Sequence, residues 1–384
     1  MTFIKAELKA TEASHNNDNN HKSTNVTSKI SIPKANLESG QEIFIKTPLI
    51  ESVILKQYAA NRPVYLKMEN CQPSGSFKLR GLSNLCQYAK SHGYERFVCP
   101  SGGNAGMATA YSARKLGMPC HIVVNKQTPE STRETIAAFG ASVEIYGNSV
   151  NESVVRAKQL TEEDPKLFLV HPFDHKAIWD GHSSMIDEIA EELGQEPSII
   201  VTCCGGGGLT NGLVRGCRRH NWETTKILSM EAIGCHSFNI SLQNNCKRTR
   251  MENMSSRVVC LSVDEVCQEI LDEYQKAEPP ILSRLVEERD AAKACLKFAD
   301  DHRVLVGLAC GTCLAALYEG IIERMLTGTE DPKEKELDKV KLDLNGNRID
   351  EYDNGGPIVV IVCGGAEISM KQMDFYRKLW NFDD

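Results

Sequence analysis

The sequence has no long apolar run: no stretch approaches the ~20 consecutive apolar residues that a membrane-spanning helix needs. Residues 1–7 also lack the apolar core of a secretory signal peptide. Positive charge is not in excess, since 44 Lys and Arg stand against 51 Asp and Glu and leave a net charge of -7. This balance argues against a nucleic-acid or anionic-membrane surface. We therefore expect a cytoplasmic protein with neither a membrane nor a nucleic-acid partner.

Motifs for zinc and for nucleotides are also missing. The 15 cysteines include no paired CxxC and no Cys/His cluster spaced for zinc. The lone CxxC, Cys310 to Cys313, runs into a helical pattern, so we interpret it as structural and expect reduced, mostly buried thiols. Four glycines at 205–208 are not followed by the Lys-Ser/Thr of a Walker loop, and they do not form GxGxxG.

The ordinary composition, 41% hydrophobic and 25% charged over 384 residues, allows a large core and two lobes. From residue 64 onward, short apolar runs alternate with longer amphipathic ones. Strands are predicted at 64–69, 96–99, 121–124, 143–146, 167–170, 199–203, 227–231 and 358–362. Helices are predicted at 77–90, 104–116, 129–139, 149–160, 177–193, 209–219, 289–301 and 312–325. This alternation predicts an α/β fold in which helices cover parallel sheets and ligands bind at the carboxyl ends of strands.

Two polar segments interrupt this rhythm. Residues 1–40 are rich in Asn, Ser and Thr, and we expect a disordered tail. Residues 327–356 are rich in Lys, Glu and Asp, which predicts a solvated insertion. The spacing after Asp343 does not fit a calcium loop, because its glycine is fourth rather than sixth and position twelve is Asn354.

One lysine stands out. In Ser74-Gly75-Ser76-Phe77-Lys78-Leu79 it follows a Ser/Gly turn between an aromatic and an aliphatic residue, which predicts an amine in the first turn of a helix and partly desolvated. Desolvation lowers the pKa of a lysine, and a neutral amine can form a Schiff base with a carbonyl cofactor. On this evidence alone, a solvated surface charge is the other interpretation.

Two glycine-rich turns follow Lys78. The loop 205–208 lies between an apolar run and a helical segment, where successive backbone N–H groups could hold a phosphate, although a flexible turn is the alternative. In Ser101-Gly102-Gly103-Asn104-Ala105-Gly106, the Ser101 hydroxyl and the Asn104 amide could hold a carboxylate, or Asn104 could only cap the helix.

Lys78 in Ser-Phe-Lys-Leu-Arg-Gly, the Ser101 turn and the four-glycine loop stand in the order used by fold-type II pyridoxal-phosphate (PLP) enzymes. Within these, the chain resembles the animal-type L-serine/L-threonine dehydratases over about residues 44 to 377. Further matching segments are Lys46-Thr47-Pro48-Leu49, Pro172-Phe173-Asp174, Ile178-Trp179-Asp180-Gly181-His182, His236-Ser237-Phe238 and Val362-Cys363-Gly364-Gly365. The resemblance implies a tryptophan synthase β-like fold with two domains, each a twisted, mostly parallel sheet flanked by helices. It also implies a large PLP-binding domain (41–75 plus 176–384), a small mobile domain (76–175) and a homodimer.

The resemblance assigns roles to matching positions. Lys78 would form the Schiff base with PLP and act as the α-proton base, and Ser101 is the second predicted catalytic residue. Phe77 would pack on the pyridine face, Asn104 would bond the 3′-oxygen and Cys363 would approach the ring nitrogen. The phosphate would be bound by Gly205, Gly206, Gly207, Gly208 and Leu209. The substrate would be bound by Ser101, Gly102, Asn104 and Ala105. Glu231 matches the acidic ligand of a possible K⁺ site, although a surface carboxylate at a strand end is the alternative.

These roles predict α,β-elimination, in which L-serine yields pyruvate and L-threonine yields 2-oxobutyrate, each with ammonium. A thiol at the ring nitrogen cannot stabilise a pyridinium as a carboxylate would, and this favours loss of the β-hydroxyl over transamination. The alternatives are a catalytically impaired PLP-binding homologue with a regulatory role, a serine racemase, and a β-replacement enzyme such as a cysteine synthase.

The chain departs from the family pattern in three places. Gly307-Leu308 stands where family members commonly have Glu-Pro, which removes an acidic group from near the cofactor edge. Ala366-Glu367 replaces Ser-Asn, and we expect Glu367 to point outward and cap the last helix. Gly102 replaces an alanine found in some dehydratases, and we expect it to widen the site beside the substrate Cβ.

Overall fold

The computed structural model of the protein describes residues 42–336 and 353–382. The predicted polar tail, 1–40, and the central part of the predicted insertion, 337–352, lie outside the described residues. The described end of that insertion includes a short 3₁₀ helix, η4 (Pro332–Lys335).

The described residues form ten strands, which lie in two sheets. The larger sheet has the order β1-β2-β10-β7-β8-β9 and the smaller one has the order β5-β4-β3-β6. Every neighbouring pair is parallel except β1 and β2. The bounds in the larger sheet are β1 Leu49–Glu51, β2 Val64–Lys67, β7 Ile199–Cys203, β8 Lys226–Ala232, β9 Ile281–Val286 and β10 Ile358–Ile361; in the smaller they are β3 Arg96–Cys99, β4 Cys120–Val124, β5 Ser142–Ile145 and β6 Leu167–Leu169.

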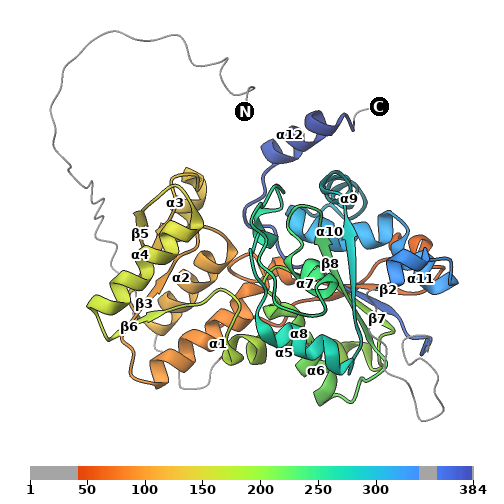
Figure 1. Ribbon diagram of the computed structural model, residues 1–384, viewed down its shortest axis with the longest axis horizontal. Coiled ribbons are helices and arrows are strands. Elements are labelled where there is room, and N and C mark those ends of the chain that lie inside the picture. The colour runs from red at the N-terminus through yellow and green to blue at the C-terminus, as the bar shows by residue number, and fades with distance from the viewer. Residues whose placement is uncertain (1–41, 337–352, 383–384) are drawn as a thin grey trace, which may run out of the picture. The chain divides into compact units, whose positions relative to one another are not determined.

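The last strand lies in the middle of the larger sheet. β10 pairs with β2 on one side and with β7 on the other, although it comes latest of the strands in the chain (Figure 1). All residues of β7 and β10 are buried, as expected for central strands covered on both faces. The carboxyl ends of β2, β7 and β10 therefore meet at one edge.

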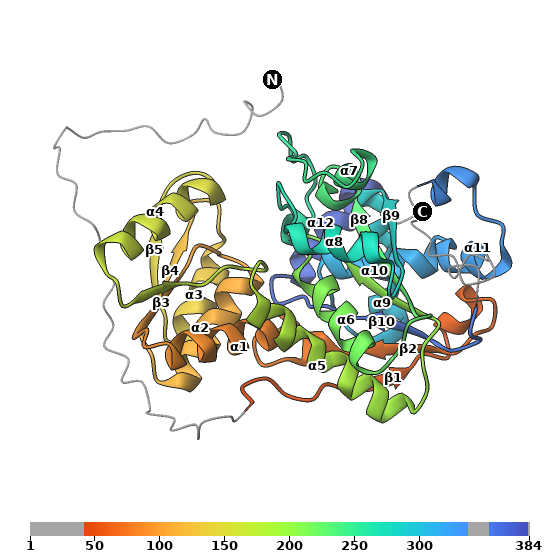
Figure 2. The same cartoon turned by 60° about the horizontal axis from the view of Figure 1, so that its bottom comes forward.

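Helices cover both sheets. They are α1 Lys78–Ser91, α2 Asn104–Leu116, α3 Glu130–Ala138, α4 Val150–Glu163, α5 Lys176–Leu193, α6 Gly208–Arg219, α7 Ser237–Gln243, α8 Gln268–Lys276, α9 Glu288–His302, α10 Leu308–Tyr318, α11 Ile321–Thr327 and α12 Met370–Trp380. α1 packs against α2 of the smaller sheet and against α5, which packs on α6 of the larger one (Figure 2). All described residues belong to one compact unit, and the division into a large and a small mobile domain stays a prediction.

The predicted α/β fold is confirmed, with differences of detail. All eight predicted strands are present, but β1 and β9 were missed, the second because Arg284 interrupts its apolar run. The predicted helix 312–325 is wrong: the chain divides into α10 and α11 at Gly320, whose φ of 73° ends the first helix. Helices α7 and α8 were also missed, whereas α12 is the last helix that was expected after Glu367 without bounds.

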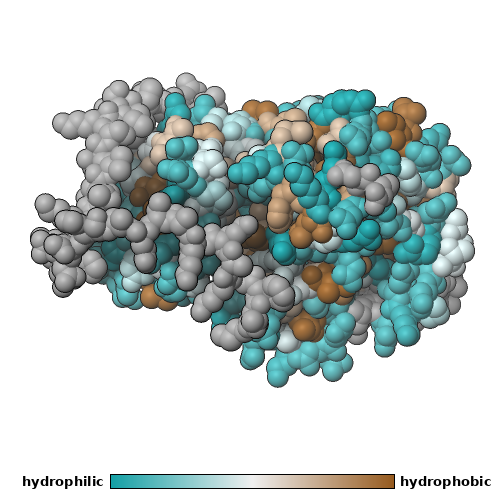
Figure 3. Space-filling model, turned by 90° about the horizontal axis from the view of Figure 1, so that it is seen from above, coloured by the Kyte–Doolittle hydropathy of each residue, from teal (hydrophilic) through white to brown (hydrophobic). Residues whose placement is uncertain are grey.

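No described helix combines the length and the apolar character that crossing a membrane requires. In Figure 3, hydrophilic residues cover most of the described surface on the face drawn, and hydrophobic residues form separate small groups.

Candidate active site

The lysine singled out in the sequence begins α1. The segment before it pairs with the chain beyond β10, through a bridge between Ser76 and Gly364. The Phe77 N–H also donates to the Cys363 carbonyl oxygen at 3.0 Å. Lys78 Nζ donates to the Pro172 carbonyl oxygen at 2.7 Å and lies 5.3 Å from the centroid of the Phe77 ring. Lys78 is thus fixed at the carboxyl end of the larger sheet.

The surroundings of the Lys78 amine favour its neutral form. Desolvation lowers the pKa of Lys78 to about 8, and the nearby groups that partly oppose this shift are the thiols of Cys260, Cys203, Cys99 and Cys363. Uncharged thiols do not compensate an ammonium as a carboxylate would. The lysine therefore has the lowered pKa expected from its neighbours in the sequence, and it can act as a nucleophile near neutral pH.

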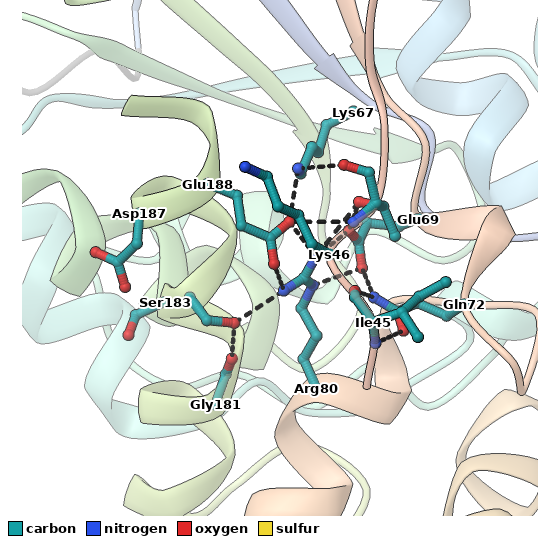
Figure 4. A network of polar contacts seen from close by, with 12 residues as sticks. Ile45, Lys46, Lys67, Glu69, Gln72, Arg80, Gly181, Ser183, Asp187 and Glu188 are labelled. Atoms are coloured by element: carbon teal, nitrogen blue, oxygen red, sulfur yellow. Dashed lines mark hydrogen bonds and ion pairs between the residues drawn. The ribbon is translucent and has the colours of Figure 1, made fainter. Parts of the chain in front are cut away.

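A buried ion-pair network, which sequence analysis missed, positions this end of α1. Arg80 is fully buried and lies between Glu69, after β2, and Glu188, on α5 (Figure 4). Its Nε and Nη2 bond Glu69 at 2.8 Å each, and its Nη1 and Nη2 bond Glu188 at 2.6 and 2.7 Å. Lys67 adds a second cation, with Nζ 2.6 Å from Glu188. Burial alone would raise the pKa of Glu188, but the bonds from Arg80 and Lys67 hold it below its usual value.

The four-glycine loop joins β7 to α6 and presents free donors. Within the described part of the chain, the backbone N–H groups of residues 205–209 have no hydrogen-bond acceptor. The loop is tightly packed, since a Cβ on Gly206 would lie 2.3 Å from the Phe173 ring and Gly207 has a φ of 90°. Phe173 follows Pro172, the acceptor of the Lys78 amine. The flexible-turn alternative is therefore not favoured, and the loop has the geometry of an anion cradle near Lys78.

The turn at Ser101 leaves the amide of Asn104 available. The Ser101 hydroxyl accepts from the Gly103 N–H at 3.3 Å, and Gly103 rather than Asn104 is the N-cap of α2. Asn104 Oδ1 is buried without a partner in the described structure, and Ala105 is also buried. Asn104 is thus not a cap, and its amide can serve a ligand.

The expectation that Gly102 widens the site is wrong. A Cβ on Gly102 would lie 2.5 Å from the Thr128 hydroxyl oxygen and 3.1 Å from the Thr128 Cβ. The space that an alanine methyl group would occupy is therefore filled by Thr128, a residue that sequence analysis did not consider.

Glu367 also lies where the sequence did not predict it. It does not cap α12, because Ser369 does, with its hydroxyl accepting from the Gln372 N–H at 3.3 Å. Instead Glu367 Oε1 accepts from Cys260 Sγ at 3.2 Å, and Cys260 Sγ accepts in turn from Asn104 Nδ2 at 3.5 Å. Glu367 is therefore connected to the Ser101 turn.

Cys363 is part of a thiol cluster, although the sequence showed no spacing that indicates one. Its Sγ lies 3.8 Å from that of Cys203 at the end of β7, and the sulfurs of Cys203, Cys313 and Cys363 all lie within 4.8 Å of one another. Bonds from Cys313 and Cys363 hold the pKa of Cys203 well below its usual value, whereas its bond to Cys203 raises the pKa of Cys363 well above. Cys363 is therefore a neutral thiol, and the cluster offers three sulfur ligands to a thiophilic metal ion.

Glu231, at the end of β8, is fully buried and is not a surface carboxylate. Its oxygens accept from the N–H groups of Phe238 and Asn239 at 2.9 and 2.8 Å. Burial raises the pKa of Glu231 to about 8, although these two bonds partly lower it. No described hydrogen bond links Glu231 to the lysine or to the glycine loop.

Comparison with known proteins agrees with this geometry. The model of the family described as "Pyridoxal-phosphate dependent enzyme" matches residues 41–329. The chain belongs to this family. It is 38% identical to the mouse (Mus musculus) "L-serine dehydratase/L-threonine deaminase" over 333 residues, 87% of this chain and 94% of that protein. It is also 39% identical to the mouse "Serine dehydratase-like" protein over 327 residues, 85% and 92% of the two chains.

Among solved structures, a fungal L-serine ammonia-lyase from Rhizomucor miehei matches with a TM-score of 0.77 and 30% identity. The match covers 88% of this chain and all (100%) of the fungal chain. The predicted fold-type II architecture is therefore confirmed.

The residues present fit the cofactor that this family name implies. PLP carries a phosphate and an aldehyde, and the site offers a row of free N–H donors and an amine whose pKa is lowered to about 8. The unpartnered Asn104 amide oxygen, after β3, and the neutral Cys363 thiol, after β10, add further polar groups. These features arise from this chain's own packing and do not depend on the family match.

Proposed function

We propose that this PLP-family protein is an L-serine and L-threonine dehydratase that releases pyruvate or 2-oxobutyrate with ammonium. The observation that carries the proposal is the Lys78 amine, held at 2.7 Å by the Pro172 carbonyl oxygen beside an anion cradle, with its pKa lowered to about 8. The names of the similar mouse and fungal proteins, which refer to serine dehydration and ammonia release, support the choice of substrate.

In this proposal, each predicted residue holds one part of PLP. Lys78 would bind the aldehyde carbon, the Phe77 ring would pack on the pyridine face and Asn104 would bond the 3′-oxygen. The phosphate would accept from the N–H groups of residues 205–209, at the start of α6, where the helix dipole favours an anion. When bound, PLP supplies an electron sink for the α-carbon.

The chain's own groups would supply the remaining chemistry. The Ser101 hydroxyl and the N–H groups of its turn, including Gly102 and Ala105, would hold the substrate carboxylate. That placement would bring the α-proton to the Lys78 amine, which can accept a proton because its conjugate acid has a pKa of about 8. Cys363 would face the ring nitrogen as a neutral thiol and would not transfer its proton, since its pKa is raised well above the usual value. This limits charge delocalisation into the ring and favours elimination.

Glu231 is the candidate ligand for a monovalent cation. A fully buried carboxylate with only two backbone donors is incompletely compensated, and a nearby K⁺ would stabilise its ionised form. The proposal also includes the homodimer, the cytoplasmic location and the lid movement of residues 76–175 expected from the sequence.

The deciding experiment measures keto-acid and ammonium release from the purified, PLP-loaded protein. L-Serine and L-threonine are each tested with and without K⁺, and the product is resolved by chirality to detect D-serine. We expect equal amounts of keto acid and ammonium from L-serine. D-Serine without keto acid would indicate a racemase instead, and unchanged substrate would indicate the regulatory alternative.

A further inference from the structure

The side chain of Glu367 lies against Gly307 at the edge of the site. A Cβ on Gly307 would lie 2.4 Å from Glu367 Oε1. The backbone of Gly307 does not itself require glycine, because its φ of -76° and ψ of 166° suit any residue. The missing side chain at position 307 is thus needed for space, and the Glu367 carboxylate uses that space.

A directed chain of hydrogen bonds links this carboxylate to the turn that begins α2. The Asn104 Nδ2 donates to Cys260 Sγ at 3.5 Å, and the Cys260 thiol donates to Glu367 Oε1 at 3.2 Å. A neutral thiol has one proton, so it can accept from the amide while it donates to the carboxylate. The Asn104 amide and the Glu367 carboxylate are therefore connected through the Cys260 thiol.

The second oxygen of Glu367 also points to a ligand. Glu367 Oε2 is buried and has no hydrogen-bond partner in the described structure. Asn104 Oδ1 is likewise buried without a hydrogen-bond partner there. A buried acceptor without a donor is costly, which is why such atoms usually mark a bound group. Both atoms are therefore free to accept a hydrogen bond from a bound group.

We propose that Glu367 is a positioning residue that supplies, from the segment after β10, the negative charge that position 307 lacks. The proposal rests on the proposed function, because it assumes PLP with its 3′-oxygen beside Asn104. The carboxylate would act through Cys260 and Asn104, and its charge would favour the protonated state of the nitrogen that joins Lys78 to the cofactor. The loss of the acidic residue at position 307 would then not make this chain an impaired homologue.

The test uses the spectrum of bound PLP, which does not require turnover. The visible absorbance of the PLP-loaded protein is titrated with pH for wild type, Glu367→Gln and Glu367→Asp. We expect the absorbance transition of Glu367→Gln to move to lower pH by about one unit, since an opposite charge is removed. Glu367→Asp retains the charge and should titrate near wild type.

A second test moves the carboxylate from position 367 to position 307. Gly307→Glu alone should weaken PLP binding, because two carboxylates would compete for one space, and Glu367→Ser alone should shift the titration as Glu367→Gln does. The double variant Gly307→Glu/Glu367→Ser should return the transition toward wild type. Coincident titrations of wild type and Glu367→Gln would overturn the proposal. A wild type that binds PLP normally but releases no keto acid would instead refute the proposed function and leave this spectral test valid.

Discussion

The Phe77 N–H donates to the Cys363 carbonyl oxygen at 3.0 Å, which joins the residue before the lysine to the residue proposed to face the ring nitrogen of PLP. The two residues lie far apart in sequence and meet only because β10 inserts between β2 and β7. The same insertion brings Cys363 to 3.8 Å from Cys203. The proposed cofactor site is therefore assembled at the ends of strands from opposite parts of the chain.

Replacing the central lysine should remove cofactor attachment. Lys78→Ala is expected to lose the visible absorbance of bound PLP, near ~410–430 nm, together with all turnover, since it removes the amine proposed to form the Schiff base. The matched control is Lys90→Ala near the end of the same helix, where the Lys90 amine donates to the Leu116 carbonyl oxygen at the surface. Lys90→Ala should retain both properties. Turnover by Lys78→Ala would refute the assignment.

The rate of PLP attachment should depend on pH in a defined direction. Because the pKa of Lys78 is lowered to about 8, its neutral fraction rises about tenfold per pH unit below that value and levels off above it. Mixing the PLP-free protein with PLP between pH 6 and 10 and following absorbance should give a rate that rises and then reaches a plateau near pH 8. A rate still rising steeply between pH 9 and pH 10 would show an ordinary, solvated lysine.

Breaking the Arg80 network should destabilise the protein strongly. Arg80→Met leaves the carboxylates of Glu69 and Glu188 without their main partner, and an uncompensated buried charge costs about 3–5 kcal/mol in the free energy of unfolding. Denaturant unfolding measures this loss. The control is Lys46→Met, which removes the exposed pair between Lys46 and Glu191 and should change stability little. Equal losses of unfolding free energy for the two substitutions would show that the buried network stabilises the protein no more than the exposed pair does.

Two glycines of the proposed phosphate loop should differ in their tolerance of a methyl group. Gly206→Ala would place a Cβ 2.3 Å from the Phe173 ring, whereas the nearest atom to a Cβ at Gly205 is 3.4 Å away, an ordinary contact. Gly206→Ala is therefore expected to weaken PLP binding by tenfold or more (order of magnitude for ~1.4 kcal/mol), and Gly205→Ala should have the smaller effect. Fluorescence titration with PLP measures both affinities. A larger loss of PLP affinity for Gly205→Ala than for Gly206→Ala would mean that the contact with Phe173 does not determine the conformation of the loop.

The sequence itself determined the local elements and the motifs that lie within them. Apolar runs and glycine turns have short-range physical causes, so the strand before the glycine loop and the helix after the Ser101 turn could be predicted from neighbouring residues. The lowered pKa of Lys78 was also expected, because its apolar neighbours Phe77 and Leu79 are adjacent in the chain. A strand of mixed polarity gave no such signal, since β9 contains Arg284.

Contacts between distant segments were decided only by the tertiary structure. Nothing in the sequence places Thr128 against Gly102, Glu367 against Gly307 or Cys203 against Cys363, because each pair depends on which strands are neighbours and how their ends meet. For the same reason the expectations of an open space at Gly102 and of an outward Glu367 were wrong. Burial shifts pKa values and creates unpaired acceptors through packing from all sides, and that packing exists only after the sheets and helices have assembled.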